Sequence, residues 1–145
     1  MIDEIDHKIL TILQQNARIS NANIARELGV APSGVFERIK KLEQRGIIKG
    51  YHAALDHEKL GQGVTAFVFL HAGDRVGSVE GAGRVAKIDE IVEVQHIAGE
   101  DGILVKLRCG SNEELGRILR EKIGSIPSIR SSRTLVVMET IKEQG

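Results

Sequence analysis

The chain has 145 residues, and its 20 Lys and Arg balance its 20 Asp and Glu, so a positive field for an anionic partner has to be local. Its single cysteine, Cys109, excludes an internal disulfide and a cysteine-based metal cluster. No apolar run approaches the length of a membrane span, and the polar, acidic start does not read as a targeting segment. We therefore expect a cytoplasmic protein of two small domains, with no membrane, metal or other cofactor.

The first predicted element is a helix that begins near Asp3, a residue type that caps helix N-termini. Ile5, Ile9 and Leu13 recur at a spacing of four, and Leu10 widens this apolar stripe. Two further helices are predicted directly after it, so three helices can close a small core.

Residues 21–50 predict a short helix, a tight turn and a second helix. The short helix ends at Gly29, where the chain must turn, and Pro32 opens the second helix. The residues on the buried faces are Ile24, Ala25 and Leu28 in the first helix and Val35, Ile39 and Leu42 in the second.

Helix-turn-helix modules set their second helix in the major groove of double-stranded DNA, with its N-terminal residues at the base edges. We predict that the polar side of this helix faces DNA and that Arg38 is its best reader of a base. The residues on that side are Ser33, Gly34, Glu37, Arg38 and Lys41. The alternative is an ordinary helical hairpin whose cations form a solvated face.

After Gly46, short β-prone runs broken at Gly50 predict the hairpin wing of a winged helix over residues 47–55, with Lys49 contacting phosphates. Residues 38–49 include five cations against one acid, Glu43, so positive charge is concentrated where DNA would lie. One module with so few cations should bind weakly and with strong salt dependence. Tight binding by this domain, residues 1–55, therefore needs more than one copy.

Residues 56–63 are polar and glycine-bearing and read as a linker to a second domain over residues 64–145. Four β-rich runs, at residues 64–72, 91–98, 102–109 and 129–138, are separated by helices at residues 78–88 and 111–124. Ser111 and Glu114 form a capping box for the later helix, whereas Gly81 and Gly83 each weaken the earlier one by about 1 kcal/mol. Two right-handed crossovers give an α+β fold, in which a ferredoxin-like βαββαβ domain has a four-stranded antiparallel sheet with both helices on one face.

The first strand of that sheet is apolar on both of its faces over residues 64–70. A half-solvated antiparallel strand should alternate apolar with polar residues, so a second protein surface is expected to bury the face without helices. We infer a homodimer through the second domain, which would present two helix-turn-helix units to a pseudo-palindromic DNA site.

Several short motifs follow one another along the chain: IDHKIL at residues 5–10, NAR at 16–18, IA at 24–25, RIKKLE at 38–43, GII at 46–48 with GY at 50–51, and LG at 60–61. Together they resemble the Lrp/AsnC family of transcriptional regulators, the feast/famine proteins, over essentially the whole chain. The resemblance implies a winged helix followed by a ligand-responsive ferredoxin-like domain, dimers paired through their sheets, frequent assembly into octamers, and amino acids or related metabolites as effectors. The family commonly caps its recognition helix with serine where this chain has Ala31, a loss of about 1 kcal/mol that Pro32 partly offsets.

In that family a glycine-led loop between the second and third strands helps to form the effector pocket, and here it aligns with Gly99, Glu100, Asp101 and Gly102. Gly102 stands where the family often has Asp. Glu100 or Asp101 can pair with the ammonium group of an effector, while the glycines let backbone N–H groups approach its carboxylate. The alternative is a plain acidic hairpin turn. On the last strand, Ser132 and Thr134 match the family's hydroxyl positions near this pocket.

Catalytic motifs are missing from the sequence. Residues 81–86 satisfy G-x-G-x-x-A but lie well after the first strand, which favours a helix of small residues over a dinucleotide site. The five histidines show no ligand spacing on one helix face, and Cys109 has no obvious partner base. We predict no catalytic or metal site, and a sequence-specific DNA-binding regulator tuned by an amino acid or similar metabolite. The alternative is an AsnC-like haem-pathway decarboxylase or a metabolite-binding module that does not bind DNA.

Overall fold

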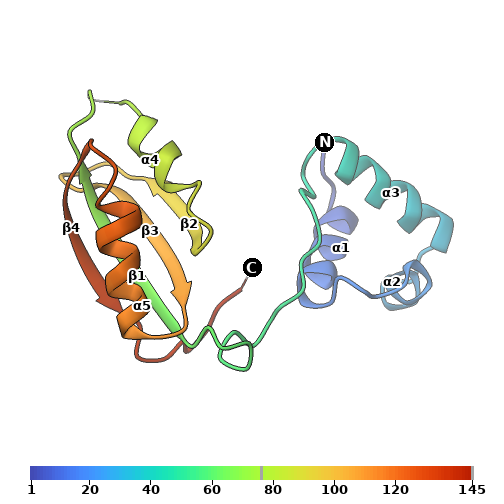
Figure 1. Ribbon diagram of the computed structural model, residues 1–145. Helices are drawn as coiled ribbons and strands as arrows, with labels where there is room; N and C mark the ends of the chain where they lie inside the picture. Colours follow the sequence, from blue (N-terminus) through green and yellow to red (C-terminus); the bar gives the residue numbers. More distant parts are fainter. Residues whose placement is uncertain (76, 145) are drawn as a thin grey trace. The chain divides into compact units, whose positions relative to one another are not determined.

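In the computed structural model the chain forms two compact units, Met1–Ala54 and Leu55–Glu143 (Figure 1). The structure describes residues 1–75 and 77–144. None of the described helices is both long and apolar enough to cross a membrane. Residues 56–63, predicted as a linker, belong to the second unit and contain a turn in which the N–H groups of Leu60 and Gln62 donate to the His57 carbonyl.

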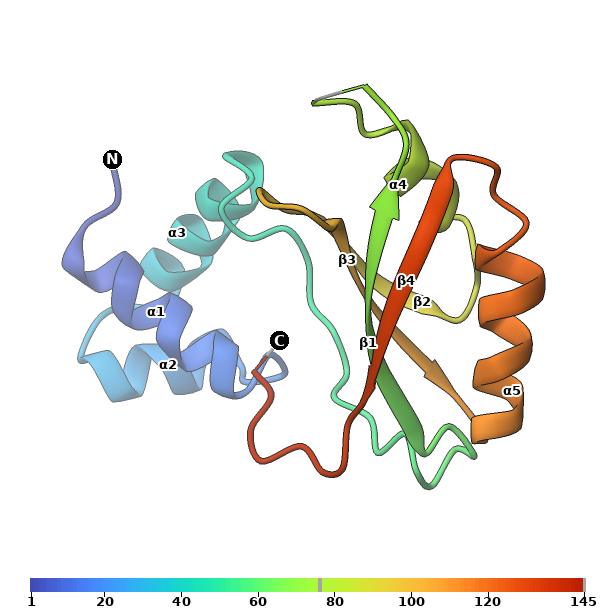
Figure 2. The ribbon, with the colours of Figure 1, turned by 90° about the vertical axis from the view of Figure 1, so that its left-hand side faces the viewer.

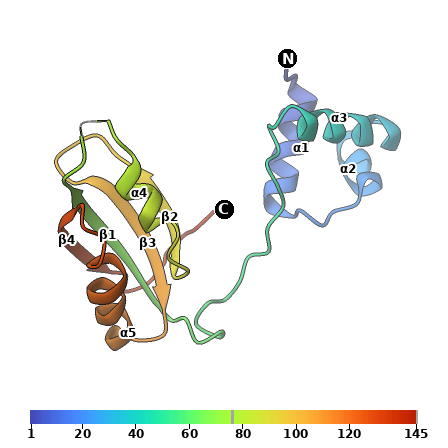
Figure 3. The same cartoon turned by 45° about the horizontal axis from the view of Figure 1, so that its top comes forward.

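The first unit consists of α1 (Glu4–Gln15), α2 (Asn21–Leu28) and α3 (Pro32–Gln44), the three helices that the apolar spacing predicts (Figure 3). Asp3 caps α1 and forms a reciprocal capping box with Asp6. Gly29 ends α2 in the left-handed conformation, whereas Ala31 gives α3 no side-chain cap. The buried apolar residues of this unit are Ile9, Ile24, Ala25, Val35 and Leu42.

The segment after α3 differs from the prediction. Residues 47–55 are all described and form no strand, so the expected hairpin wing is wrong. The N–H groups of Ile47 and Ile48 both donate to the Leu42 carbonyl, at 3.0 and 3.2 Å, and so satisfy the end of α3 instead of a strand ladder. Local capping overrides the β-propensity of the two isoleucines.

The second unit contains β1 (Val64–Ala72), α4 (Glu80–Val85), β2 (Ile91–His96), β3 (Gly102–Cys109), α5 (Asn112–Arg117) and β4 (Ile129–Val136). All strand pairs are antiparallel, and the sheet order is β2-β3-β1-β4. Figures 1 and 2 show α4 and α5 on the same face of this sheet. The ferredoxin-like α+β fold predicted from the strand and helix order is confirmed.

Two helix ends in this unit depart from the prediction. Ser111 caps α5 by accepting from the Glu114 N–H at 3.1 Å, but Glu114 Oε2 accepts from the Gly110 N–H at 2.7 Å, so the box closes one residue earlier. α4 is shorter than residues 78–88. A Cβ added at Gly81 would lie 2.7 Å from Asp74 Oδ2, so the glycine lets α4 pack close to the loop after β1.

A π-helical segment, Ile118–Ile123, continues α5. Its wider turns are closed by hydrogen bonds between residues five apart, such as that from the Gly124 N–H to the Leu119 carbonyl at 2.8 Å. Ile118 and Ile123 are therefore both buried although they are five positions apart.

The core of the second unit lies between the sheet and the helices. The core-facing residues of the two central strands are Ala66, Val68 and Leu70 of β1 and Ile103, Val105 and Leu107 of β3. The other face of the sheet, here called the open face, carries Thr65, Phe67, Phe69, Leu104, Lys106 and Leu135. Phe67 and Phe69 remain partly exposed there, so β1 is apolar on both sides, as the sequence predicts.

Candidate DNA-binding helix and effector loop

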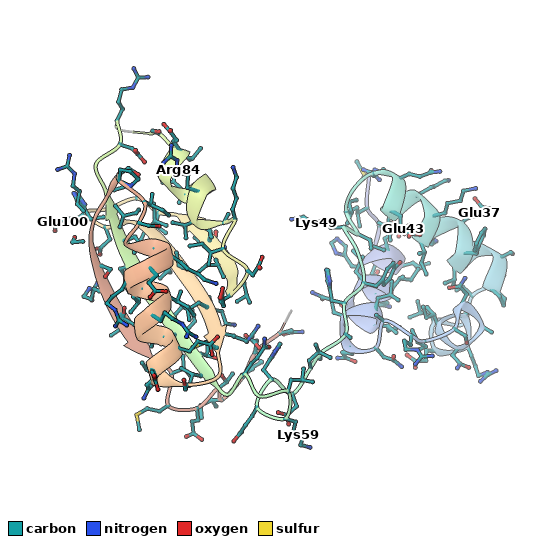
Figure 4. All side chains as sticks on the ribbon, in the orientation of Figure 1. Glu37, Glu43, Lys49, Lys59, Arg84 and Glu100 are labelled. Atoms are coloured by element: carbon teal, nitrogen blue, oxygen red, sulfur yellow. The ribbon has the colours of Figure 1, made fainter. Side chains whose placement is uncertain are left out.

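The polar side of α3 is displayed to solvent. Val35 and Leu42 are both buried, and Val35 packs in one cluster with Ile9 of α1 and Ile24 of α2, which fixes the orientation of the helix. The exposed residues on its other side include four of the five DNA contacts predicted on this helix, namely Ser33, Gly34, Glu37 and Lys41, together with Phe36 and Lys40. In Figure 4 the Glu37 side chain extends outward from α3.

Arg38 does not share this orientation, which corrects its predicted place on the outer side. It follows the buried Val35 by three positions, so it lies on the flank of the helix that faces α1. Its Nη1 donates to Asp3 Oδ2 at 2.7 Å and to Asp6 Oδ1 at 3.0 Å. The hydrogen bond from Arg38 lowers the pKa of Asp3, and the same bond raises the pKa of Arg38. In this structure the guanidinium therefore links α3 to the start of α1.

The remaining cations of the predicted DNA-binding region stay available. Lys40, Lys41, Arg45 and Lys49 are exposed, and within the described part of the chain none of them lies within 4.0 Å of a carboxylate oxygen. Lys49 sits on the irregular segment after α3 and not on a wing strand (Figure 4). A row of free cations along one helix and the chain that follows it suits a phosphate backbone.

The predicted effector loop connects β2 to β3. Gly99 and Gly102 adopt φ values of 125° and 83°, a region that side chains disfavour, and the Ile97 N–H donates to the Gly102 carbonyl at 2.8 Å. The loop borders a cavity of about 580 Å³, within the usual range for small-molecule sites. Residues on either side of the loop, from His96 to Ile103, also line this cavity. The remaining lining residues come from the end of β1 and the chain after it, and include His71, Asp74, Arg75 and Ser78.

The two carboxylates of this loop differ in their contacts. Arg133 Nη2 lies 3.3 Å from Asp101 Oδ2, and the same guanidinium stacks over the Phe69 ring at 4.4 Å. Glu100 is exposed at the rim of the cavity, and its backbone carbonyl accepts from His71 Nδ1 at 2.7 Å (Figure 4). Asp101 already has an internal cation, so Glu100 is the freer of the two to receive an ammonium group.

Comparison with known families matches both units. A family model described as winged helix-turn-helix DNA-binding covers residues 2–49, and one described as Lrp/AsnC ligand binding domain covers residues 65–145. The chain belongs to the Lrp/AsnC family. It is a DNA-binding regulator with a ligand-binding domain.

Named relatives agree with this membership. HTH-type transcriptional regulator FL11 of Pyrococcus horikoshii is 39% identical over 143 residues, which cover 98% of this Lrp/AsnC chain and 93% of the relative. The structure of E. coli AsnC has a TM-score of 0.90 at 30% identity and covers 100% of this chain and 97% of that one. A transcriptional regulator of Neisseria meningitidis in complex with L-Met gives a TM-score of 0.92 at 25% identity, with 99% and 94% covered.

The last two predicted effector residues lie elsewhere in this Lrp/AsnC protein. On β4, Ser132 pairs with Leu70 and Thr134 with Val68, so both hydroxyl residues lie on the helix-covered side of the sheet. Neither lines the cavity beside the loop. Within one chain, the structure therefore does not bring these hydroxyls together with Gly99–Gly102.

Sequence reasoning also missed residues at both sites. His71 and Arg133 come from β1 and β4 and reach the loop only through strand pairing. Phe36 looks like a core residue by composition, yet its side chain is exposed. The one signal for the Arg38 contacts was the pair Asp3 and Asp6, three residues apart at the start of α1.

Proposed function

We propose that this Lrp/AsnC protein binds a specific DNA operator by placing α3 in the major groove, with Ser33, Gly34 and Glu37 at base edges. Lys41 and Lys49 contact the phosphate backbone. The observation that carries the proposal is the exposed side of α3, whose cations have no acidic partner among the described residues. Selection of bound sequences from random DNA tests it, and a pool that shows no enriched sequence would refute it.

Arg38 has a supporting part in this proposal: it positions α3 through Asp3 and Asp6 and does not read a base. Arg38→Ala should then weaken binding to all sequences by a similar factor. Asp3→Asn is the matched variant, because asparagine still caps a helix but loses the charge that holds Arg38. It should weaken binding as well. If Asp3→Asn tightens binding, or Arg38→Ala relaxes preference at one base pair, Arg38 reads the operator directly.

An amino acid is the proposed effector, bound in the cavity beside Gly99–Gly102. Two relatives support this choice, since the N. meningitidis regulator and a feast or famine regulatory protein of M. tuberculosis were each solved with L-methionine. In this chain Glu100 receives the ammonium group, and the backbone at the two glycines approaches the carboxylate. Asp101 keeps Arg133 in place.

Calorimetry with a panel of amino acids tests the effector site. Glu100→Gln should weaken binding of the effector, Asp101→Asn should weaken it less, and Gly99→Val should block it, while DNA binding without effector stays unchanged. An effector that alters DNA affinity must bind the free and DNA-bound protein with two different dissociation constants. Wild-type affinity in all three variants would place the effector elsewhere.

We further propose a homodimer that pairs the open faces of two sheets, with assembly of dimers into octamers as a further step. Phe67, Phe69 and Leu135 give this face an apolar centre that is partly exposed in the single chain. Two copies would carry two α3 helices to the halves of a pseudo-palindromic operator, so one dimer presents twice as many cations to DNA as a single module.

The protein is proposed to act by binding and not by catalysis. Its relatives are named as transcriptional regulators, which supports a non-enzymatic role. Assays for tetrapyrrole turnover and for operator binding on the same preparation separate this role from the decarboxylase alternative.

A further inference from the structure

Phe36 is a large apolar side chain that the fold of its unit does not use. It lies on α3 next to the fully buried Val35, yet 53% of its surface is exposed. The apolar residues that pack around the first core do not include it. Among the described residues of this unit, the other exposed large apolar side chains lie outside helices, at Met1 and Tyr51. Phe36 is therefore the exposed apolar group that a helix holds in a fixed direction.

The neighbours of Phe36 on the exposed side of α3 are polar. Ser33 precedes it by three positions, Lys40 follows it by four, and Glu37 is adjacent, so one ring stands among hydrogen-bonding and charged groups. A protein-docking surface usually needs an apolar patch of several residues. A single exposed ring beside free lysines fits DNA better than it fits a protein surface, because DNA carries isolated apolar groups on its bases next to an anionic backbone.

We propose that Phe36 contacts the 5-methyl group of a thymine in the major groove and so sets the preference of the protein at that base pair. Thymine is the base that displays a methyl group on the floor of this groove, and a phenyl ring can recognise it by apolar contact alone. Hydrogen bonds from Ser33 and Glu37 would read the polar edges on either side. This contact rests on the proposed placement of α3 in the major groove. It adds to that placement a further base-contacting residue, Phe36, and the base that it recognises, thymine.

Replacing thymine by deoxyuridine tests this contact, because it removes the methyl group and leaves base pairing intact. On the selected operator, each thymine is replaced in turn, and the wild-type dissociation constant is measured by fluorescence anisotropy. At one position in each half-site the replacement should weaken binding about fourfold, the effect expected for one methyl removed from an apolar contact. Elsewhere it should have no effect.

Three variants then assign the methyl dependence to this ring. Phe36→Ala should bind thymine and deoxyuridine operators equally at the sensitive position, whereas Phe36→Leu should keep part of the difference. Lys40→Ala is the matched control: it should lose affinity on both DNAs and keep the fourfold ratio. Circular dichroism checks that the variants are folded, and the partial loss of the ratio in Phe36→Leu decides the assignment if Phe36→Ala is not folded.

The result that overturns the proposal is a wild-type protein insensitive to every thymine replacement, or a Phe36→Ala variant that keeps the wild-type ratio. A Phe36→Ala variant with equal losses on both DNAs and an unchanged ratio would instead assign the ring to a contact between protein copies. Absence of wild-type binding to any selected DNA is a separate outcome, and it would refute the groove placement of α3 itself.

Discussion

Gly81→Ala should destabilise the second unit although alanine is the better helix former. The added Cβ would lie 2.7 Å from Asp74 Oδ2 and 3.2 Å from Ser128 Oγ. Asp74 cannot move away at no cost, because the same oxygen accepts from the Gly81 N–H at 3.0 Å. Overpacking of this kind costs about 1–3 kcal/mol, whereas alanine gains about 1 kcal/mol in helix propensity over glycine. We expect an overpacking cost in the upper part of its range, because the contact with Asp74 is so short, and the net effect is then destabilising.

Gly83→Ala is the matched control, because it lies in the same helix and no atom approaches its added Cβ within 4 Å. It should raise stability by up to about 1 kcal/mol. Thermal unfolding of the full chain, followed by circular dichroism, should show the melting temperature of the second unit lower in Gly81→Ala and higher in Gly83→Ala, by about 4–8 °C per kcal/mol. Equal shifts in the two variants would refute the close approach of α4 to Asp74.

Three other outcomes are expected. Lys41→Ala should reduce the slope of log DNA affinity against log salt concentration by about 0.9 per bound copy, whereas Lys87→Ala in the other unit should not change this slope. Equal slopes for Lys41→Ala and the wild-type protein would exclude a phosphate contact by Lys41. Phe67→Lys should dissociate the dimer or unfold it, because an unpaired buried charge costs about 3–5 kcal/mol, and sedimentation of this variant as an intact dimer would contradict the open-face interface. Lys122 lowers the pKa of Glu90 by a side-chain hydrogen bond, so the stabilisation is present above the ordinary glutamate pKa and is lost as the pH falls through the lowered value. Urea unfolding of wild type and Lys122→Met should therefore differ at neutral pH and converge in strong acid, and a constant difference would contradict the pairing.

The helices and strands were predictable wherever one periodic pattern spans the element. Val64–Ala72 and Gly102–Cys109 match their predicted limits because alternate residues of both strands enter one core. The wing was predicted wrongly because the hydrogen bonds of Ile47 and Ile48 go to a helix end, and periodicity carries no information about hydrogen-bond partners.

The candidate sites were less accessible to sequence reasoning than the fold. Arg38 meets Asp3 across 35 positions, and Arg133 meets Asp101 across 32. Ion pairs between residues so far apart in the sequence depend on how helices cross and how strands align. A periodic pattern along the chain contains neither, so sequence reasoning assigns such cations to the solvent-exposed surface.

The π-helical segment Ile118–Ile123 implies that the chain is one residue longer here than a regular α-helix would need. At about 100° per residue, an α-helix would turn Ile118 and Ile123 about 140° apart, and one of them would leave the core. If Arg120, which is exposed, were deleted, Ile123 would follow Ile118 by four positions instead of five, which restores ordinary helical spacing of these two buried residues. This place in the fold should therefore tolerate the loss of one residue without a change in the sheet or in the crossover that follows β3.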